Sequence, residues 1–315
     1  MKKIENIKKT SFVKKIFIKL CRIIGFEIID QSNLYVPTSE KFVNQNINIL
    51  GKSNISIPLG ETKIVRAVKS LDIIIKTCTS VNLVTQNKKR VFERNKSEYT
   101  FRTINSIINS LEFCKDELKK IKIKIFIIDY NSKKDDLVKI NNKLTEANLE
   151  FKIINLKLDK LDQIKTINKN NTIIENNMKA TMSSIRESFD VAKKDCDDLV
   201  YFVEDDYIHK RESIFEMISS YEKISSELNK DIFICPVDYP YLYKKLENSN
   251  IFIGTKYHWR TINETLLTFL TIKSLINKHW NNLILMCENE HSPFETPMHK
   301  IFEKELCISP IPSLA

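Results

Sequence analysis

One apolar stretch that runs directly into three acidic residues constrains this sequence most. Leu199 to Val203 is a run of apolar and β-favouring residues, long enough for one buried strand, and Glu204, Asp205 and Asp206 follow it directly. Three neighbouring carboxylates repel one another unless positive charge lies among them. Ligands of twisted α/β sheets gather at the carboxyl edge of the strands. The stretch therefore predicts either a divalent-cation site at a strand end or a solvated acidic turn before the next helix.

The composition is that of an ordinary globular protein with an excess of basic residues. The chain has 315 residues, of which 42% are hydrophobic and 29% are charged, and its formal net charge is +10. Such a charge would suit an anionic partner. The lysines are spread along the chain without interleaved aromatic residues, however, so we expect no nucleic-acid groove.

The cysteines and the hydropathy pattern bear on the compartment. Seven cysteines are scattered without a Cys-x-x-Cys pair, which favours a reducing compartment over a structural zinc site. Neither a long apolar run nor a secretory signal stands out. We expect a cytoplasmic protein, or one that is peripheral at the inner face of the membrane. The chain closes on an uncharged run, and we expect a few further residues after it in the natural protein.

Residues 1–66 differ in pattern from the rest of the chain. Residues 1–27 predict a basic amphipathic helix, which could lie on an anionic membrane surface or pack on the main domain through the same stripe. Residues 28–66 are rich in Asn, Ser, Gly and Pro and predict a linker or a small cap. We place a single larger domain at 67–315. The apolar stripe of the helix is Phe12, Val13, Ile16, Phe17, Leu20, Ile23 and Ile24.

Strands and helices alternate through the larger domain. This order implies right-handed crossovers and a mostly parallel central sheet flanked by helices. Pro236 indicates that its strand ends there or lies at an edge. The predicted strands are 71–77, 121–128, 151–156, 199–203, 231–237 and 251–254. The predicted helices are 98–114, 133–147, 182–192, 214–221, 264–279 and 297–304.

A second strand end carries an acid as well. The strand at 121–128 runs into Asp129-Tyr130-Asn131-Ser132, and both acidic ends should open on the same edge of the sheet. An Asp-x-x-Ser motif after an early strand and an Asp-x-Asp-type motif in the second half resemble the nucleotide-sugar glycosyltransferases of GT-A fold, in particular the family 2-like group. The resemblance implies a Rossmann-like α/β domain over 67–315 with an N-terminal helical appendage.

The resemblance also implies roles for the acidic residues. It assigns Asp206 to a divalent metal, Mn²⁺ or Mg²⁺, and Glu204 to the donor and the same metal, while Asp205 could substitute for either. Asp129 would lie near the base or ribose of the nucleotide, and Thr77 would line that pocket. Such an ion offsets the negative charge that develops on a sugar-diphosphate leaving group.

Residues near the end of the chain are candidates for the remaining roles. The resemblance implies a catalytic base near a helix start, for which we expect Glu295 and then Glu290. Arg260 could pair with phosphate or with a carboxylate, and Trp259 could stack on a sugar. His299 is a further candidate metal ligand. Each of these side chains could instead be structural.

Several functions are compatible with these patterns. The first is transfer of a sugar from a nucleotide-sugar donor to a glycan, lipid-linked or protein acceptor. A metal-dependent nucleotidyl or phosphoryl transferase would need a second acidic cluster, for which Asp238 is the only extra candidate. A non-catalytic basic protein that binds a membrane surface through residues 1–27 is the third. No Gly-rich phosphate loop and no nucleophile elbow is present.

Overall fold

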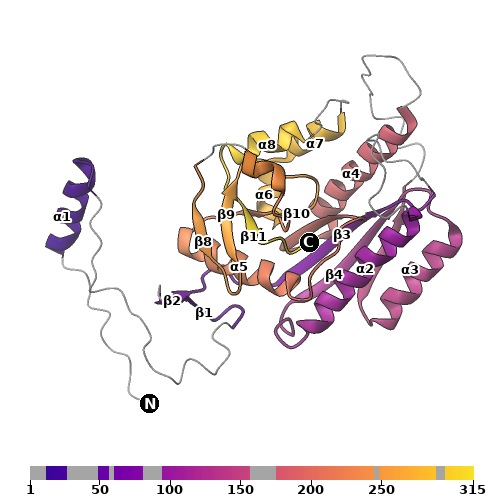
Figure 1. The fold of residues 1–315 in the computed structure, drawn as a ribbon, viewed down its shortest axis with the longest axis horizontal. Helices are drawn as coiled ribbons and strands as arrows, with labels where there is room; N and C mark the ends of the chain where they lie inside the picture. Colours follow the sequence, from indigo (N-terminus) through magenta and orange to yellow (C-terminus); the bar gives the residue numbers. More distant parts are fainter. Residues whose placement is uncertain are drawn as a thin grey trace.

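A nine-stranded sheet with helices on both faces forms the centre of the protein (Figure 1). The computed structural model describes residues 12–26, 49–56, 60–80, 94–156, 175–244, 248–288 and 295–315. The strand order is β5-β4-β3-β6-β10-β7-β11-β9-β8. The predicted α/β class, with a large central sheet flanked by helices, is confirmed.

The first half of the sheet follows the sequence pattern closely. Four Ile- and Val-rich strands pair in parallel in the order β5-β4-β3-β6. Helices cross over between them, as expected for consecutive parallel strands. The strands are β3 (Ser70–Thr77), β4 (Lys122–Asp129), β5 (Glu150–Asn155) and β6 (Leu199–Glu204), and the helices are α2 (Lys96–Phe113), α3 (Lys134–Glu146) and α4 (Glu175–Asp195).

The second half is a series of shorter elements. Its strands pair both ways, so half of the strand pairs of the whole sheet are antiparallel, and the sheet is more mixed than the pattern predicts. The elements are α5 (Ser213–Leu228), β7 (Phe233–Ile234), the 3₁₀ helix η4 (Pro240–Lys244), β8 (Ile251–Ile253), β9 (His258–Ile262), β10 (Phe269–Ile272), α6 (Lys273–Lys278), α7 (Trp280–Glu288), α8 (Thr296–Phe302) and β11 (Cys307–Ile311).

The predicted helix at 264–279 is wrong in its first part. Residues Phe269–Ile272 form β10, which pairs antiparallel with β6, and only Lys273–Lys278 are helical there. Phe269 packs on Phe202 on one face of the sheet, and Leu270 is buried on the other. A short run that is buried on both faces has no alternation to distinguish it from a buried helix.

Two smaller differences concern the middle and the end of the sheet. β7 is only two residues long and ends before Pro236, but it lies between β10 and β11 and not at an edge. β11 was not among the predicted strands, and it contains Pro310, a residue that is unusual inside a strand. Pro310 is tolerated opposite Trp259 in the β9 pairing.

The helices divide the core into two layers. α2, α3 and α5 cover one face of the sheet, and α4, α6, α7 and α8 cover the other (Figure 1). Tyr201 and Phe202, adjacent in β6, enter opposite layers. This alternation holds β6 firmly from both sides, so the acidic residues at its end are carried by a rigid support.

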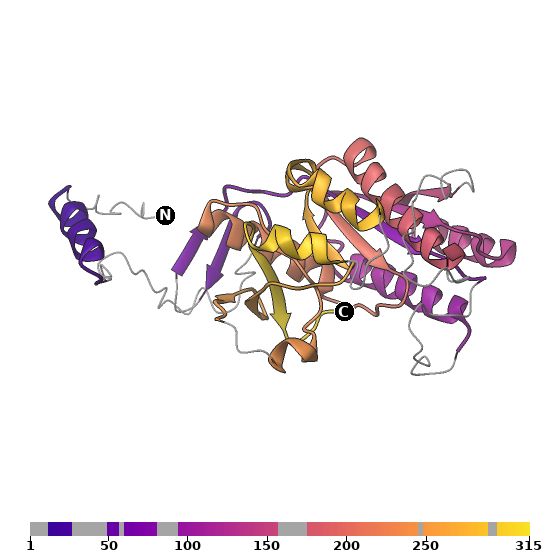
Figure 2. The ribbon, with the colours of Figure 1, turned by 90° about the horizontal axis from the view of Figure 1, so that it is seen from above.

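The described N-terminal part contains a helix and a hairpin. α1 (Phe12–Ile23) stands apart from the α/β body, and its predicted apolar stripe is 45 to 76% exposed (Figure 2). The hairpin strands β1 (Ser53–Ser56) and β2 (Gly60–Lys63) lie beside α5, where Glu222 accepts the backbone N–H groups of Gly51 and Val68, both at 2.8 Å. Among the described residues, no helix is long and apolar enough to cross a membrane.

Candidate active site at the carboxyl edge

The two acidic strand ends lie on one edge of the sheet, as predicted. Thr77 is opposite Asp129 in the parallel pairing of β3 and β4, and Lys76 is opposite Glu204 in the pairing of β3 and β6. The register therefore places Asp129 and Glu204 on either side of the end of β3. This edge is the position at which open α/β sheets bind ligands.

Asp129 is held in a hydrogen-bond network that joins two strand ends. The Thr77 hydroxyl donates to Asp129 Oδ1 at 2.8 Å, and the Ser132 N–H donates to Oδ2 at 3.2 Å. Asp129 is only 2% exposed, and Thr77 is buried beside it. The Ser132 hydroxyl in turn accepts the Thr79 N–H at 2.9 Å. The network fixes the edge of the sheet, and the role of Asp129 toward a nucleotide stays a prediction.

Two lysines lie among the acidic residues after β6. Lys76 Nζ is 3.3 Å from Glu204 Oε1, and Lys96 at the start of α2 forms an ion pair with Asp205. Thr100, one turn along α2, donates its hydroxyl to Asp205 Oδ2 at 2.7 Å. Part of the positive charge expected among these carboxylates is thus supplied by the protein itself. A charged residue inside the apolar strand 71–77 is the signal that could have revealed Lys76 from the sequence.

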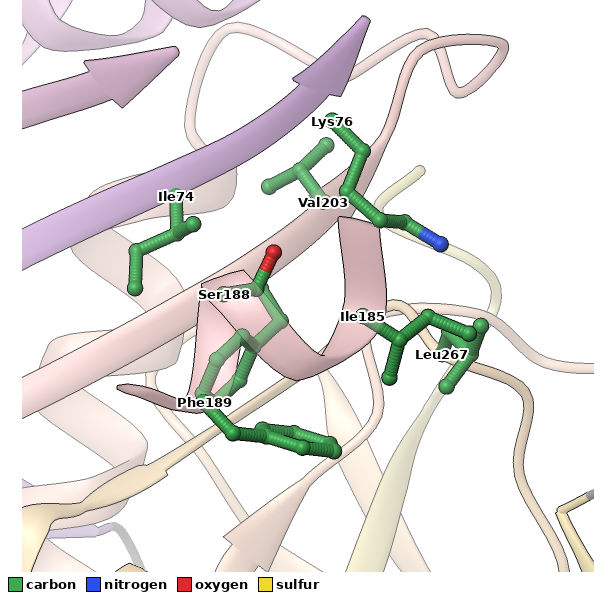
Figure 3. A pocket seen from close by; sticks show the side chains of 8 residues that line it. Ile74, Lys76, Ile185, Ser188, Phe189, Val203 and Leu267 are labelled. Atoms are coloured by element: carbon green, nitrogen blue, oxygen red, sulfur yellow. The ribbon is translucent and has the colours of Figure 1, made fainter. Parts of the chain in front are cut away.

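The stem of Lys76 runs through the apolar layer between β3 and α4. Figure 3 shows it beside Val203 and Leu267, with the ammonium at the end away from Ile74. The void at this place is about 10 Å³, which is hardly enough for one water molecule. The void is therefore a packing gap. The long apolar stem of Lys76 packs in this layer, and this is how a lysine can occupy a buried strand while its charge reaches the edge of the sheet.

Asp206 is the most open of the three acids. The residue is exposed, but protein atoms around its carboxyl group desolvate it, and this together with the charge of Glu204 raises the pKa of Asp206 to about 6. Among the described residues, no cation forms an ion pair with it. It borders a cavity of about 70 Å³ that is also lined by Arg94, Glu98, Tyr99, Arg102 and Ile208.

The carboxylates fit a divalent ion that is completed by a substrate. Within the described ranges, no group of three His, Cys, Asp or Glu side chains is arranged to hold a metal by itself. Mg²⁺ and Mn²⁺ are commonly held by one or two carboxylates together with substrate phosphates and water. Asp206, with Glu204 beside it, meets that requirement, whereas Asp205 is directed toward α2.

The side chains expected from the last third of the chain have protein partners. His299 Nε2 is 2.9 Å from the Thr265 carbonyl oxygen, so this ring nitrogen already has a protein partner. The role of His299 as a metal ligand stays a prediction. Arg260 binds Asp238 at 2.9 Å and lies over the ring of Tyr243, so the carboxylate alternative is the one observed. Trp259 is fully buried, so of its two alternatives, sugar stacking and a structural role, the structural one is observed.

Glu295 lies directly before α8, as the sequence pattern predicts. Its backbone carbonyl accepts the N–H groups of Met298 and His299 at 2.8 and 3.1 Å. The residue is only 7% exposed, and among the described residues no ion pair neutralises its carboxylate. Glu290 lies outside the described residues.

Behind the acidic loop, His209 joins β6 to α2. In the imidazole ring, Nε2 is 2.6 Å from the Tyr201 hydroxyl and Nδ1 is 3.3 Å from the Ser106 hydroxyl. The backbone N–H of His209 donates to the Ser106 hydroxyl as well, at 3.0 Å. Burial lowers the pKa of His209 to about 4. The neutral imidazole therefore belongs to the folded state.

This buried imidazole predicts a loss of stability in acid. The unfolded state, with a histidine pKa of about 6.5, binds more protons than the folded state between pH 6.5 and 4, so stability falls as the pH falls through this range. We expect His209 to contribute about 2 kcal/mol to the loss between pH 7.5 and 5. Urea unfolding of the wild type and of His209→Gln at both pH values measures it. Equal losses in the two proteins would show that His209 does not titrate on unfolding.

Comparisons with known proteins give limited similarity. No protein-family model and no curated protein matches the chain. A crystal structure of an active-site mutant of LgtC aligns over 73% of this chain and 64% of its own, with 10% identity and a TM-score of 0.37. A crystal structure of the galactosyltransferase LgtC with donor and acceptor sugar analogues aligns over 75% and 67%, with 9% identity and a TM-score of 0.34. This chain thus spans less than two thirds of the first protein, and such similarity assigns no family.

Proposed function

We propose that this protein is a metal-assisted glycosyltransferase of GT-A type, which moves a sugar from a nucleotide-diphosphate donor to a hydroxyl acceptor. The observation that carries the proposal is the open carboxylate of Asp206, next to Glu204, at the same strand edge as the Asp129 network. A parallel sheet half ending in such groups is a typical place for a nucleotide. A bound Mn²⁺ or Mg²⁺ would offset the charge of the leaving diphosphate.

The residues of the chain itself supply the other parts of the reaction. Lys76 and Lys96 place positive charge beside the acids, where it also favours a diphosphate. Glu295, or Glu290, would accept the proton of the acceptor hydroxyl. The acceptor oxygen then forms a bond to the anomeric carbon, while the bond from that carbon to the diphosphate oxygen breaks and the nucleoside diphosphate leaves with the electron pair.

Calorimetry tests this proposal directly. Titration of the full chain with UDP, GDP and ADP, each with and without Mn²⁺, should give binding of at least one nucleotide that depends on the ion. Binding of none of them, or binding that is indifferent to Mn²⁺, would contradict a metal-assisted donor site.

The nucleotidyl- or phosphoryl-transferase alternative is less well supported. Two-metal chemistry needs a second acidic group near the first. Asp238, the extra candidate, is engaged by Arg260 at 2.9 Å and by the Tyr243 hydroxyl at 2.7 Å. It is therefore already neutralised by the protein.

Attachment to an anionic membrane surface is a second function, and the exposure of α1 favours it. At about 100° per residue, the seven positions of the apolar stripe, from Phe12 to Ile24, fall within an arc of about 140°, and Ile18 lies outside it. Lys14, Lys15, Lys19 and Arg22 occupy positions outside this arc, and the helix contains no acidic residue. Apolar side chains on one side and cations on the other are the pattern of helices that lie in a lipid interface.

Substitution within the apolar arc should release the protein from vesicles. Phe17 is 58% exposed, and burying a phenylalanine is worth about 1.5–3 kcal/mol, so Phe17→Asp should weaken partitioning onto phosphatidylserine vesicles about tenfold or more. Co-sedimentation of the full chain measures the effect. Phe113→Asp, the same change at an exposed position of α2, is the matched control. Equal sedimentation of the wild type and Phe17→Asp would show that α1 does not bind lipid.

A further inference from the structure

Three tyrosines form a continuous row across the carboxyl edge of the sheet. Tyr207, directly after the acids of β6, shares a hydrogen bond of 2.8 Å between its hydroxyl and that of Tyr239. The ring of Tyr239 stacks on that of Tyr241, with centroids 5.4 Å apart and an interplanar angle of 27°. We call Tyr207, Tyr239 and Tyr241 the tyrosine row.

The row joins the two groups of acids that the proposed function uses. At one end, Tyr207 directly follows Asp206 in the chain. At the other end, burial and then the charge of Glu264 raise the pKa of Tyr241 to about 12, and Glu295 adds to the effect. The hydrogen bond and the ring stack of the row therefore connect Tyr241 to the turn that carries the acids after β6.

The outer ring of the row is the most open to a ligand. Tyr241 is 38% exposed, whereas Tyr239 beneath it is 8% exposed. Tyr239 directly precedes η4 and Tyr241 lies within it, and this helix is anchored by the buried Leu242 and by the hydrogen bond from Tyr243 to Asp238. The ring of Tyr241 is thus presented on a fixed support, so little entropy is lost when a ligand covers it.

We infer that Tyr241 forms the floor of an acceptor subsite for a carbohydrate ring, whose reacting hydroxyl faces Glu295. This inference rests on the proposed function and names the class of acceptor. One face of a pyranose ring presents C–H groups that pack on an aromatic ring, while its hydroxyls donate to carboxylates such as Glu264 and Glu295.

The chemistry of the row favours a sugar over an acyl chain. The charges of Glu264 and Glu295 act on Tyr241 at the open end of the row, so an alkyl chain laid over this ring would bring apolar surface toward carboxylates, which need polar partners. A lipid-linked or protein-linked acceptor would then be recognised through its sugar.

Binding of simple glycosides tests the subsite without knowledge of the natural acceptor. The probes are the methyl glycosides of glucose, galactose, mannose and N-acetylglucosamine, titrated onto the full chain and followed by saturation-transfer difference NMR. We expect at least one to bind, Tyr241→Ala to weaken that binding about fivefold or more, and Tyr241→Phe to retain it because the ring is kept. Phe113→Ala, at an exposed aromatic position of α2, should bind like the wild type.

Nucleotide titration of the same proteins separates this inference from the proposed function. Tyr241→Ala should bind nucleoside diphosphate with Mn²⁺ as the wild type does. If the wild type binds none of the four glycosides, or if Tyr241→Ala binds them equally well, the carbohydrate subsite is overturned while nucleotide binding still stands. If glycoside binding is lost in Tyr241→Ala but no nucleotide binds the wild type, the subsite stands and glycosyl transfer from a nucleotide donor falls.

Discussion

Replacing Asp206 with asparagine is expected to weaken Mn²⁺-dependent binding of a nucleoside diphosphate about 100-fold or more. Loss of an outer partner of a metal ligand already costs about 10- to 100-fold in metal affinity, so loss of the ligand charge itself should cost no less. The substitution keeps the size of the side chain, and Asp206 is exposed, so the fold should be unaffected. Calorimetric titration in the presence and absence of Mn²⁺ measures the change.

Two further variants make the result for Asp206 specific. Asp135→Asn removes the same charge from an exposed position in the first turn of α3 and should leave nucleotide binding unchanged. Asp205→Asn removes the carboxylate that binds Lys96 and Thr100, and should mainly lower the stability of the fold. Unchanged binding in Asp206→Asn together with loss in Asp205→Asn would move the metal to Asp205.

The first half of the fold could be predicted because its strands and helices have unambiguous periods. The strands at 71–77, 121–128 and 199–203 each contain a run of consecutive apolar residues, which is not the pattern of a helix with one apolar face. The helices between them do show that pattern, with one apolar face each. Their parallel pairing then fixes which residues share an edge, so the meeting of Asp129 and Glu204 beside β3 followed from topology alone.

The second half could not be predicted in the same way. β7 and β10 are two and four residues long, and their positions are set by the strands that pair with them. The pairing of Phe269 with Phe202 involves residues 67 positions apart, which no local pattern reveals. Tertiary contacts therefore override local propensity there.

The charged side chains of the site illustrate the same limit. A sequence shows that acids follow β6, but it does not show that Lys76 and Lys96 reach them from β3 and α2. It likewise cannot show that Arg260 already has Asp238 as a partner. Ion pairs between distant elements decide which charges remain available to a ligand. Arg260 has such a partner, whereas Asp206 has no ion pair among the described residues, and its role as a metal ligand stays a prediction.

Replacing Glu295 with glutamine should lower turnover about 100-fold or more while donor binding is retained. A positioned general base contributes about 10²- to 10⁴-fold to such reactions, and glutamine keeps the shape of the side chain but cannot accept the acceptor proton. Glu295 is 7% exposed and lies directly before α8, and its charge is among those that raise the pKa of Tyr241, on which the acceptor ring is proposed to pack.

The measurement is the release of nucleoside diphosphate from a sugar donor carrying the nucleotide that calorimetry identifies. Glu303→Gln, an exposed position at the other end of α8, is the matched control and should keep full turnover. Full activity in Glu295→Gln would assign the base to Glu290. Loss of both turnover and nucleotide binding would instead show that Glu295 supports the donor site, since a base acts on the acceptor and leaves donor affinity unchanged.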